Sequence, residues 1–215
     1  MHFSVDAILF DIDGTLVDST AAVVRTWETW AAQRGIDAQE ILRVCHGRRT
    51  EDTLTFFLPA EQHAAAIAEL GQLELADLDD VIALPGTQSL LRRLPTDRWA
   101  AVTSGSRHVM ETRLTATGLP IPDVLVSAEA VEAGKPDPEG YLKAAAALGR
   151  DPGRCLVVED APAGIEAGRA AGARVLAVAT SHPAEELTAA DAVVPDLTAV
   201  EVEITADGVV VSTTA

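Results

Sequence analysis

The sequence predicts an α/β protein with a parallel sheet, helices on both faces of that sheet, and an inserted α-helical segment near the N-terminus. Short apolar runs alternate with helical patterns from about residue 84 onward, as βαβ units require. One isolated apolar run, residues 5–10, comes before a long stretch that has only helical periodicity. Hydrophobic residues make up 48% of the 215-residue chain, enough to bury the core of one such domain.

The elements are expected in a regular order. Residues 5–10 form the first strand, and residues 19–82 form about four short helices punctuated by glycine and proline. The later strands are expected at 99–103, 123–126, 155–158, 174–178 and 192–194. Helices are expected between them at 86–94, 107–118, 138–148 and 161–171.

This alternation predicts a Rossmann-like core domain, residues 1–17 and 84–215, and a helical cap domain, residues 18–83. The tail 200–212 has Asp207-Gly208 between two Val/Ile runs, which predicts a β-hairpin at one edge. In the cap, the aromatic residues are expected in its core; they are Trp27, Trp30, Phe56 and Phe57.

Charge and composition exclude several partners. The formal net charge of −17 repels nucleic acid and anionic membrane surfaces. No apolar run reaches the roughly 20 residues of a membrane-spanning helix. The two cysteines, Cys45 and Cys155, form no metal-spaced pair, so we expect a reduced, cytoplasmic protein. We also expect a monomer or weak dimer.

The first strand ends in two carboxylates, Asp11 and Asp13, followed by Gly14. Alternate side chains of an extended chain share a face, so both carboxylates can address one site. Ligands of open α/β sheets bind at the carboxyl ends of the strands, where this pair is expected. Two adjacent carboxylates repel unless a cation or a shared proton compensates. The alternative interpretation is an ordinary Asp/Gly turn.

The second strand of the core ends in Thr103-Ser104-Gly105, at the start of a helix. Hydroxyls and free backbone N–H groups at a helix start can hold a phosphate, although Ser or Thr is also a common N-cap. Lys135, one of two lysines in the chain, lies in a loop stiffened by two prolines. A fixed ammonium there would offset carboxylate repulsion and bind a phosphoryl group.

A second acidic pair, Glu159 and Asp160, follows the apolar run 155–158. This pair also suits the N-terminus of a helix, and that interpretation is compatible with a binding site. If the strands are neighbours, it converges with Asp11 and Asp13. Four carboxylates need a hard cation, and an oxygen-only ligand set selects Mg²⁺ rather than zinc.

In these four segments the chain resembles the haloacid dehalogenase superfamily of phosphohydrolases, and within it the phosphatases of sugar and polyol phosphates. Asp11-Ile12-Asp13-Gly14-Thr15 is similar to the first motif of that superfamily. Thr103, Lys135 and Glu159-Asp160 are similar to the second, third and fourth motifs. The resemblance implies a small-molecule phosphate ester as substrate.

The resemblance also implies roles for these residues. Asp11 is expected to be the nucleophile and Asp13 the general acid and base. Mg²⁺ is expected on Asp11, the Asp13 carbonyl and Asp160, with Glu159 assisting. The phosphoryl oxygens are expected to be held by Thr103, Lys135 and the N–H groups near Gly14, Ser104 and Gly105.

In the cap, His46-Gly47-Arg48-Arg49 is the cationic cluster expected to bind the substrate, with Arg49 shifting substrate preference. The alternative is a solvated helix start. A phosphosugar mutase of the β-phosphoglucomutase type is the second candidate function, although residues 20–24 lack its cap-hinge histidine. A non-catalytic binding module on the same fold is a remote alternative.

Overall fold

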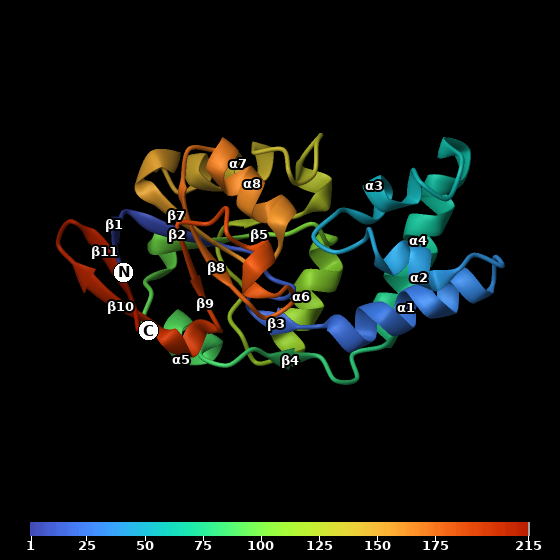
Figure 1. Cartoon of the computed structure of the whole chain (residues 1–215), viewed down its shortest axis with the longest axis horizontal. Coiled ribbons are helices and arrows are strands. Elements are labelled where there is room, and N and C mark those ends of the chain that lie inside the picture. The colour runs from blue at the N-terminus through green and yellow to red at the C-terminus, as the bar shows by residue number, and fades with distance from the viewer. Residues whose placement is uncertain (215) are drawn as a thin grey trace.

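The computed structural model describes residues 1–214 and places a parallel sheet at the centre of the molecule (Figure 1). The strand order is β6-β5-β2-β7-β8-β9, and every neighbouring pair is parallel. Its strands are β2 (Ala7–Phe10), β5 (Trp99–Val102), β6 (Leu125–Val126), β7 (Cys155–Glu159), β8 (Arg174–Val178) and β9 (Ala192–Val194). The predicted parallel α/β fold is confirmed, and two strands begin and end where the sequence predicts.

Successive residues of each strand point to opposite faces of this sheet. Both faces carry apolar side chains, and helices pack on each of them. On one face Ile8 and Phe10 pack with α5 (Thr87–Leu91) and α6 (Arg107–Ala116). On the other face Leu9 packs with α7 (Glu139–Ala147) and α8 (Pro162–Ala170). Sheet residues are therefore apolar on both sides, as buried parallel strands require.

A second, antiparallel sheet joins the two ends of the chain, with the strand order β1-β11-β10. Its strands are β1 (His2–Val5), β10 (Val200–Thr205) and β11 (Gly208–Thr213). The hairpin prediction is confirmed, but the hairpin pairs with β1 rather than with the main sheet. The predicted first strand, 5–10, is two strands in two different sheets, and Asp6, which lies between them, binds Arg154.

Residues 20–76 form four α-helices at the end of the molecule opposite the antiparallel sheet (Figure 1). They are α1 (Thr20–Ala32), α2 (Ala38–Leu42), α3 (Thr50–Leu54) and α4 (His63–Ala76). Two short strands that sequence analysis missed, β3 (Val17–Asp18) and β4 (Ile82–Ala83), pair where the chain enters and leaves this segment. The exact domain boundaries stay a prediction.

The helical segment has its own apolar cluster, separate from the two that flank the main sheet. Trp27 and Trp30 belong to it, and Phe57 packs against it, as expected. Phe56 is 61% exposed, so its predicted core position is wrong. Among the helices of residues 1–214, none has the length and apolar character needed to cross a membrane.

Candidate active site

The predicted site segments meet at the carboxyl ends of three adjacent strands. Phe10 at the end of β2 is in register with Ala101 of β5 and Val158 of β7. Asp11 follows β2, Thr103 follows β5, and Glu159 ends β7. Lys135 lies on the connection between β6 and α7, the next strand and helix along. The order of the strands therefore brings together four segments that are far apart in the sequence.

Lys135 is the cation at the centre of this cluster, with only 6% of its side chain exposed. Its Nζ donates to Asp11 Oδ1 at 2.5 Å, to Glu159 Oε1 at 2.5 Å and to the carbonyl of Val102 at 3.3 Å. Burial lowers the pKa of Lys135, but the two carboxylates raise it further, so the net pKa lies above its usual value. The ammonium therefore stays charged.

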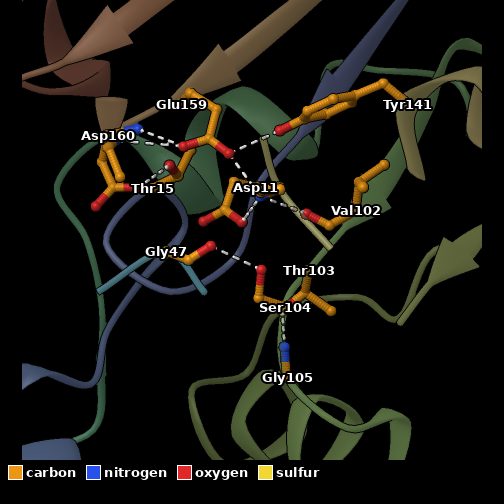
Figure 2. Close-up of polar contacts among 12 residues, drawn as sticks. Asp11, Thr15, Gly47, Val102, Thr103, Ser104, Gly105, Tyr141, Glu159 and Asp160 are labelled. Atoms are coloured by element: carbon orange, nitrogen blue, oxygen red, sulfur yellow. Dashed lines mark hydrogen bonds and ion pairs between the residues drawn. The ribbon is translucent and has the colours of Figure 1, made fainter. Parts of the chain in front are cut away.

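Glu159 is held on both of its carboxylate oxygens. Oε1 accepts from Lys135 and from the hydroxyl of Tyr141 at 2.8 Å, as Figure 2 shows for the tyrosine. Oε2 accepts from the backbone N–H of Asp160 at 3.0 Å and of Ala161 at 3.3 Å. Tyr141 is fully buried, and sequence analysis assigned it no role. The geometry makes Glu159 a bridge between Lys135 and the start of α8.

Asp160 lies against the loop that follows the first strand. It accepts hydrogen bonds from Thr15 Oγ1 at 3.3 Å and from the hydroxyl of Ser181. Gly14 has φ +85°, and a Cβ there would lie 2.1 Å from Asp160 Oδ2. Glycine is thus required at position 14 both by the turn and by the close approach of the carboxylate. Ser181 is a site neighbour that sequence analysis missed.

Three buried carboxylates, those of Asp11, Glu159 and Asp160, each offer an oxygen within 4.8 Å of the others. Burial, with the neighbouring carboxylates, raises the pKa of Asp11 well above its usual value. The same causes raise the pKa of Asp160 to about 7. One ammonium does not balance three carboxylates, and the donor set is oxygen only, so these residues fit a divalent hard cation such as Mg²⁺.

The side chain of Asp13 lies outside this metal-type cluster. Its Oδ1 accepts from Ser19 Oγ at 2.7 Å and from Arg113 NH1 at 2.9 Å. Arg113, on α6, is almost completely buried, and its NH2 donates to Glu74 Oε1 of α4 at 3.1 Å. Asp13 is therefore tied through one arginine to the helical segment. Sequence analysis missed both Arg113 and Glu74.

The segment after β5 contains an N-cap, as the alternative interpretation predicts, and also places hydroxyl groups at the cavity. Ser106 is the N-cap of α6 and accepts from the N–H of Val109. Thr103 is buried, and its Oγ1 accepts from the N–H of Gly105 at 3.0 Å. Ser104 donates its hydroxyl to the carbonyl of Gly47 at 2.9 Å (Figure 2). This last bond joins the sheet side of the site to the helical segment.

A cavity of about 120 Å³ lies between the carboxylate cluster and the helical segment. The sequence-predicted residues that line it are Asp11, Asp13, Gly14, His46, Arg48, Thr103, Ser104, Gly105 and Asp160. Helices α1 and α4 contribute Val23, Trp27 and Glu74. His46 stacks edge-on against His182 across the two parts of the molecule, at 6.2 Å between ring centroids.

Arg49, expected to shift substrate preference, does not line this cavity. Its guanidinium binds the carboxylate of Asp52 through two hydrogen bonds, at 2.8 and 2.9 Å. A third bond, at 3.2 Å, goes to the carbonyl of Val131. The structure therefore places Arg48 in the cavity and turns Arg49 toward a contact between the helical segment and the sheet domain.

Comparison with known proteins agrees with this geometry. Residues 5–172 match the family model described as haloacid dehalogenase-like hydrolase. Hexitol phosphatase A of Escherichia coli is 43% identical over 194 residues, covering 88% of this chain and 90% of that protein. The 2-deoxyglucose-6-phosphate phosphatase 2 of Saccharomyces cerevisiae is 37% identical, covering 94% and 92%.

Among solved structures, a hydrolase from Pseudomonas syringae superposes with a TM-score of 0.81 at 29% sequence identity. The superposition covers 89% of this chain and 94% of that one, so it includes the helical segment as well as the sheet. The whole architecture, and not the sheet alone, is shared with known hydrolases.

Proposed function

The chain belongs to the haloacid dehalogenase-like hydrolases, and we propose that it is a Mg²⁺-dependent phosphatase of small sugar or polyol phosphates that works through an aspartyl-phosphate. It is an enzyme of the phosphoric monoester hydrolase type, which sets aside the alternative of a non-catalytic binding module. The similarity to hexitol phosphatase A and to 2-deoxyglucose-6-phosphate phosphatase 2 supports the substrate class.

The observation that carries the proposal is the meeting of Asp11 and Asp160 at the floor of a cavity that Asp13 also lines, with Lys135 hydrogen-bonded to Asp11. Lys135 fixes Oδ1 of Asp11 and leaves the other oxygen to attack phosphorus. Asp13, oriented by Ser19 and Arg113, gives a proton to the leaving alkoxide and later takes one from the attacking water.

Thr103, Gly14 and Ser104 line the cavity, and their polar groups, together with Lys135 beside Asp11, would bind the phosphoryl oxygens as negative charge shifts during transfer. Asp11 and Asp160 would hold Mg²⁺, with Glu159 adding negative charge beside them. When bound, the ion supplies positive charge that keeps Asp11 ionised and neutralises the phosphate dianion. The helical segment over the cavity excludes bulk water and limits substrate size.

Two further parts of the proposal come from the sequence. Residues 18–83 act as a cap on a core of residues 1–17 and 84–215, and the hydrogen bond from Ser104 to Gly47 supports a closed position of that cap. A cytoplasmic location, and a monomer or weak dimer, stay predictions. The mutase alternative is not favoured, since helix α1 starts without a histidine and the relatives named above are phosphatases.

The experiment is phosphate release from p-nitrophenyl phosphate and from a panel of glycerol, hexose, pentose and hexitol phosphates, with and without Mg²⁺. Asp11→Asn removes the nucleophile and is expected to abolish turnover. Asp123→Asn, the same change at an exposed residue, is the matched control. Near-normal turnover by Asp11→Asn rejects the mechanism, and the accumulation of hexose 6-phosphate from a hexose 1-phosphate would favour the mutase.

A further inference from the structure

Glu74 is a carboxylate in the cavity wall that the proposed reaction does not use. It lies on α4, four residues after buried Leu70, so it faces the same side of the helix. Only 21% of its side chain is exposed, and it lines the cavity together with Asp13 and Arg113. A carboxylate on the buried side of a helix needs a partner, because desolvation of its charge is costly.

Arg113 satisfies Glu74 only in part. Its NH2 donates to Oε1, and within residues 1–214 no hydrogen bond reaches Oε2. Burial raises the pKa of Glu74, while the charge of Arg113 opposes this rise. The same guanidinium also donates to Asp13, so Glu74 shares its cationic partner. This part of the wall can accept a hydrogen bond from a substrate and disfavours additional negative charge.

A hydroxyl group fits such a wall because it both donates and accepts hydrogen bonds. It can donate to the free oxygen of Glu74 and accept from an uncommitted N–H of Arg113, since a guanidinium has five donors. A carboxylate on the substrate has no hydrogen to donate at neutral pH and a second phosphate is mostly a dianion, so neither satisfies the free oxygen of Glu74, and the charge of Glu74 repels both. The neighbouring Val23 and Trp27 offer apolar contact to the carbon chain.

The cationic side chains near the mouth of the cavity do not reverse the preference for a neutral alcohol over an anionic one. Arg48 is exposed, so salt and water screen its charge. Partial desolvation and the proximity of His182 lower the pKa of His46, which disfavours its charged form. The better-buried Glu74 therefore has the stronger influence on which alcohol group enters.

We propose that Glu74 is a specificity-determining residue, and that it selects phosphate esters of neutral polyhydroxy alcohols over esters whose alcohol carries a carboxylate or a second phosphate. This inference rests on the proposed phosphatase function and adds the recognition of the leaving group. It also replaces Arg49 with a residue of α4 as the main determinant of substrate preference.

The test compares kcat/KM for glycerol 1-phosphate with kcat/KM for phosphoglycolate in the wild type and in Glu74→Gln. The amide keeps the size of the side chain but loses the charge. We expect the ratio of the two kcat/KM values to fall by about tenfold or more, because a charged acceptor is lost and repulsion of the glycolate is relieved. Glu69→Gln is the matched control: it lies on the same helix and pairs with Arg34, outside the cavity lining.

The ratio separates recognition from a structural role. If Glu74 only positioned Arg113 against Asp13, the variant would lose kcat equally on both substrates and the ratio would stay constant, which overturns the inference. A second variant, Glu74→Asp, keeps the charge at a shorter reach. It is expected to lose activity on glycerol 1-phosphate while still disfavouring phosphoglycolate, and it covers the case in which Glu74→Gln does not fold.

The wild type separates the two levels of the proposal. If it hydrolyses neither these esters nor p-nitrophenyl phosphate, the proposed function fails and the inference fails with it. If it hydrolyses them and Glu74→Gln leaves the ratio unchanged, the inference alone fails. A wild type that prefers phosphoglycolate would reject both the inference and the proposed substrate class.

Discussion

The floor of the cavity and the wall above it are built differently. On the floor, Asp11, Lys135 and Glu159 are buried and share one short hydrogen-bonded network on the ends of adjacent strands. On the wall, Glu74 and Arg48 come from helices and a loop, are partly open to the cavity, and make few bonds to the protein. A rigid floor suits chemistry common to all substrates, and an open wall suits discrimination among them.

The largest effect is expected on the floor, from Lys135→Ala. The change leaves the buried carboxylates of Asp11 and Glu159 without their cation. Loss of a buried pairing charge costs about 3 kcal/mol in free energy of unfolding. Loss of the phosphoryl-binding ammonium is expected to lower kcat by about 10³-fold. Steady-state kinetics and thermal unfolding measure the two effects.

The chain offers a matched control in its second lysine. Lys143→Ala makes the same change in a side chain that is about half exposed and pairs with Glu139 on the surface of α7. It is expected to change kcat by less than about twofold, because exposed ion pairs contribute little. Equal losses in the two variants would show that the floor does not depend on Lys135.

The next effect comes from Gly14→Ala, which tests how tightly the floor is built. The new Cβ would lie 2.1 Å from Asp160 Oδ2, so the carboxylate must move. A shift of about 1 Å at a reacting group lowers kcat/KM by about 10²-fold. Gly35→Ala is the control: its φ of +65° is also left-handed, but no atom lies within 4 Å of the new Cβ.

Both glycine variants are expected to lose about 1 kcal/mol of stability from the backbone conformation alone. Only Gly14→Ala is expected to lose activity. Comparing kcat/KM of the two variants under conditions where the same fraction of each is folded therefore isolates the effect of the clash between the new Cβ and Asp160. Retained activity in Gly14→Ala would mean that Asp160 tolerates displacement and that the floor is less rigid than its hydrogen bonds indicate.

The floor was more predictable than the wall, for a physical reason. Asp11, Thr103, Glu159 and Asp160 each follow an apolar run, and parallel strands bring their carboxyl ends to one edge, so local patterns imply the long-range meeting. No comparable rule predicts from the sequence which residues of α4 and α6 will be in contact. Glu74 and Arg113 are 39 residues apart and meet only through the packing of two helices, which no local pattern encodes.

Smaller features of the fold were missed for related reasons. The run 5–10 is apolar on both sides of Asp6, and it divides into β1 and β2 because β1 pairs with β11 in one sheet and β2 pairs with β5 and β7 in the other, all of them distant in the sequence. Strands β3 and β4 have two residues each, too short for any periodicity. The one sequence signal for Glu74 is its spacing of four from Leu70 on an otherwise apolar helix face.

Removal of divalent metal should destabilise the floor in a pH-dependent manner. The pKa of Asp160 is about 7 in the folded protein, against an ordinary value of 3.8. Between these values the folded state binds more protons than the unfolded state, so stability falls as pH rises across that window. We expect the Tm in EDTA to fall between pH 5 and pH 8 by about 5 °C more in the wild type than in Asp160→Asn.

Added Mg²⁺ at pH 8 is expected to restore the Tm of the wild type, because a cation that binds only the folded state stabilises it by mass action. Asp160→Asn lacks one of the ligands and is expected to respond less. Parallel pH profiles for the two proteins, or an equal response to Mg²⁺, would remove Asp160 from the metal site.

The smallest effect is expected at the mouth of the cavity, where two adjacent arginines differ in direction. Arg48 lines the cavity, whereas Arg49 binds Asp52 and the carbonyl of Val131. Arg48→Ala is expected to raise KM about threefold for all phosphate esters, an effect that disappears in about 0.5 M salt because the charge is exposed. Arg49→Ala is expected to leave the ratio of kcat/KM values between substrates unchanged and to lower the Tm. A change in that ratio would instead support the sequence-based expectation for Arg49, and would place discrimination in the contact between cap and core rather than in the cavity wall.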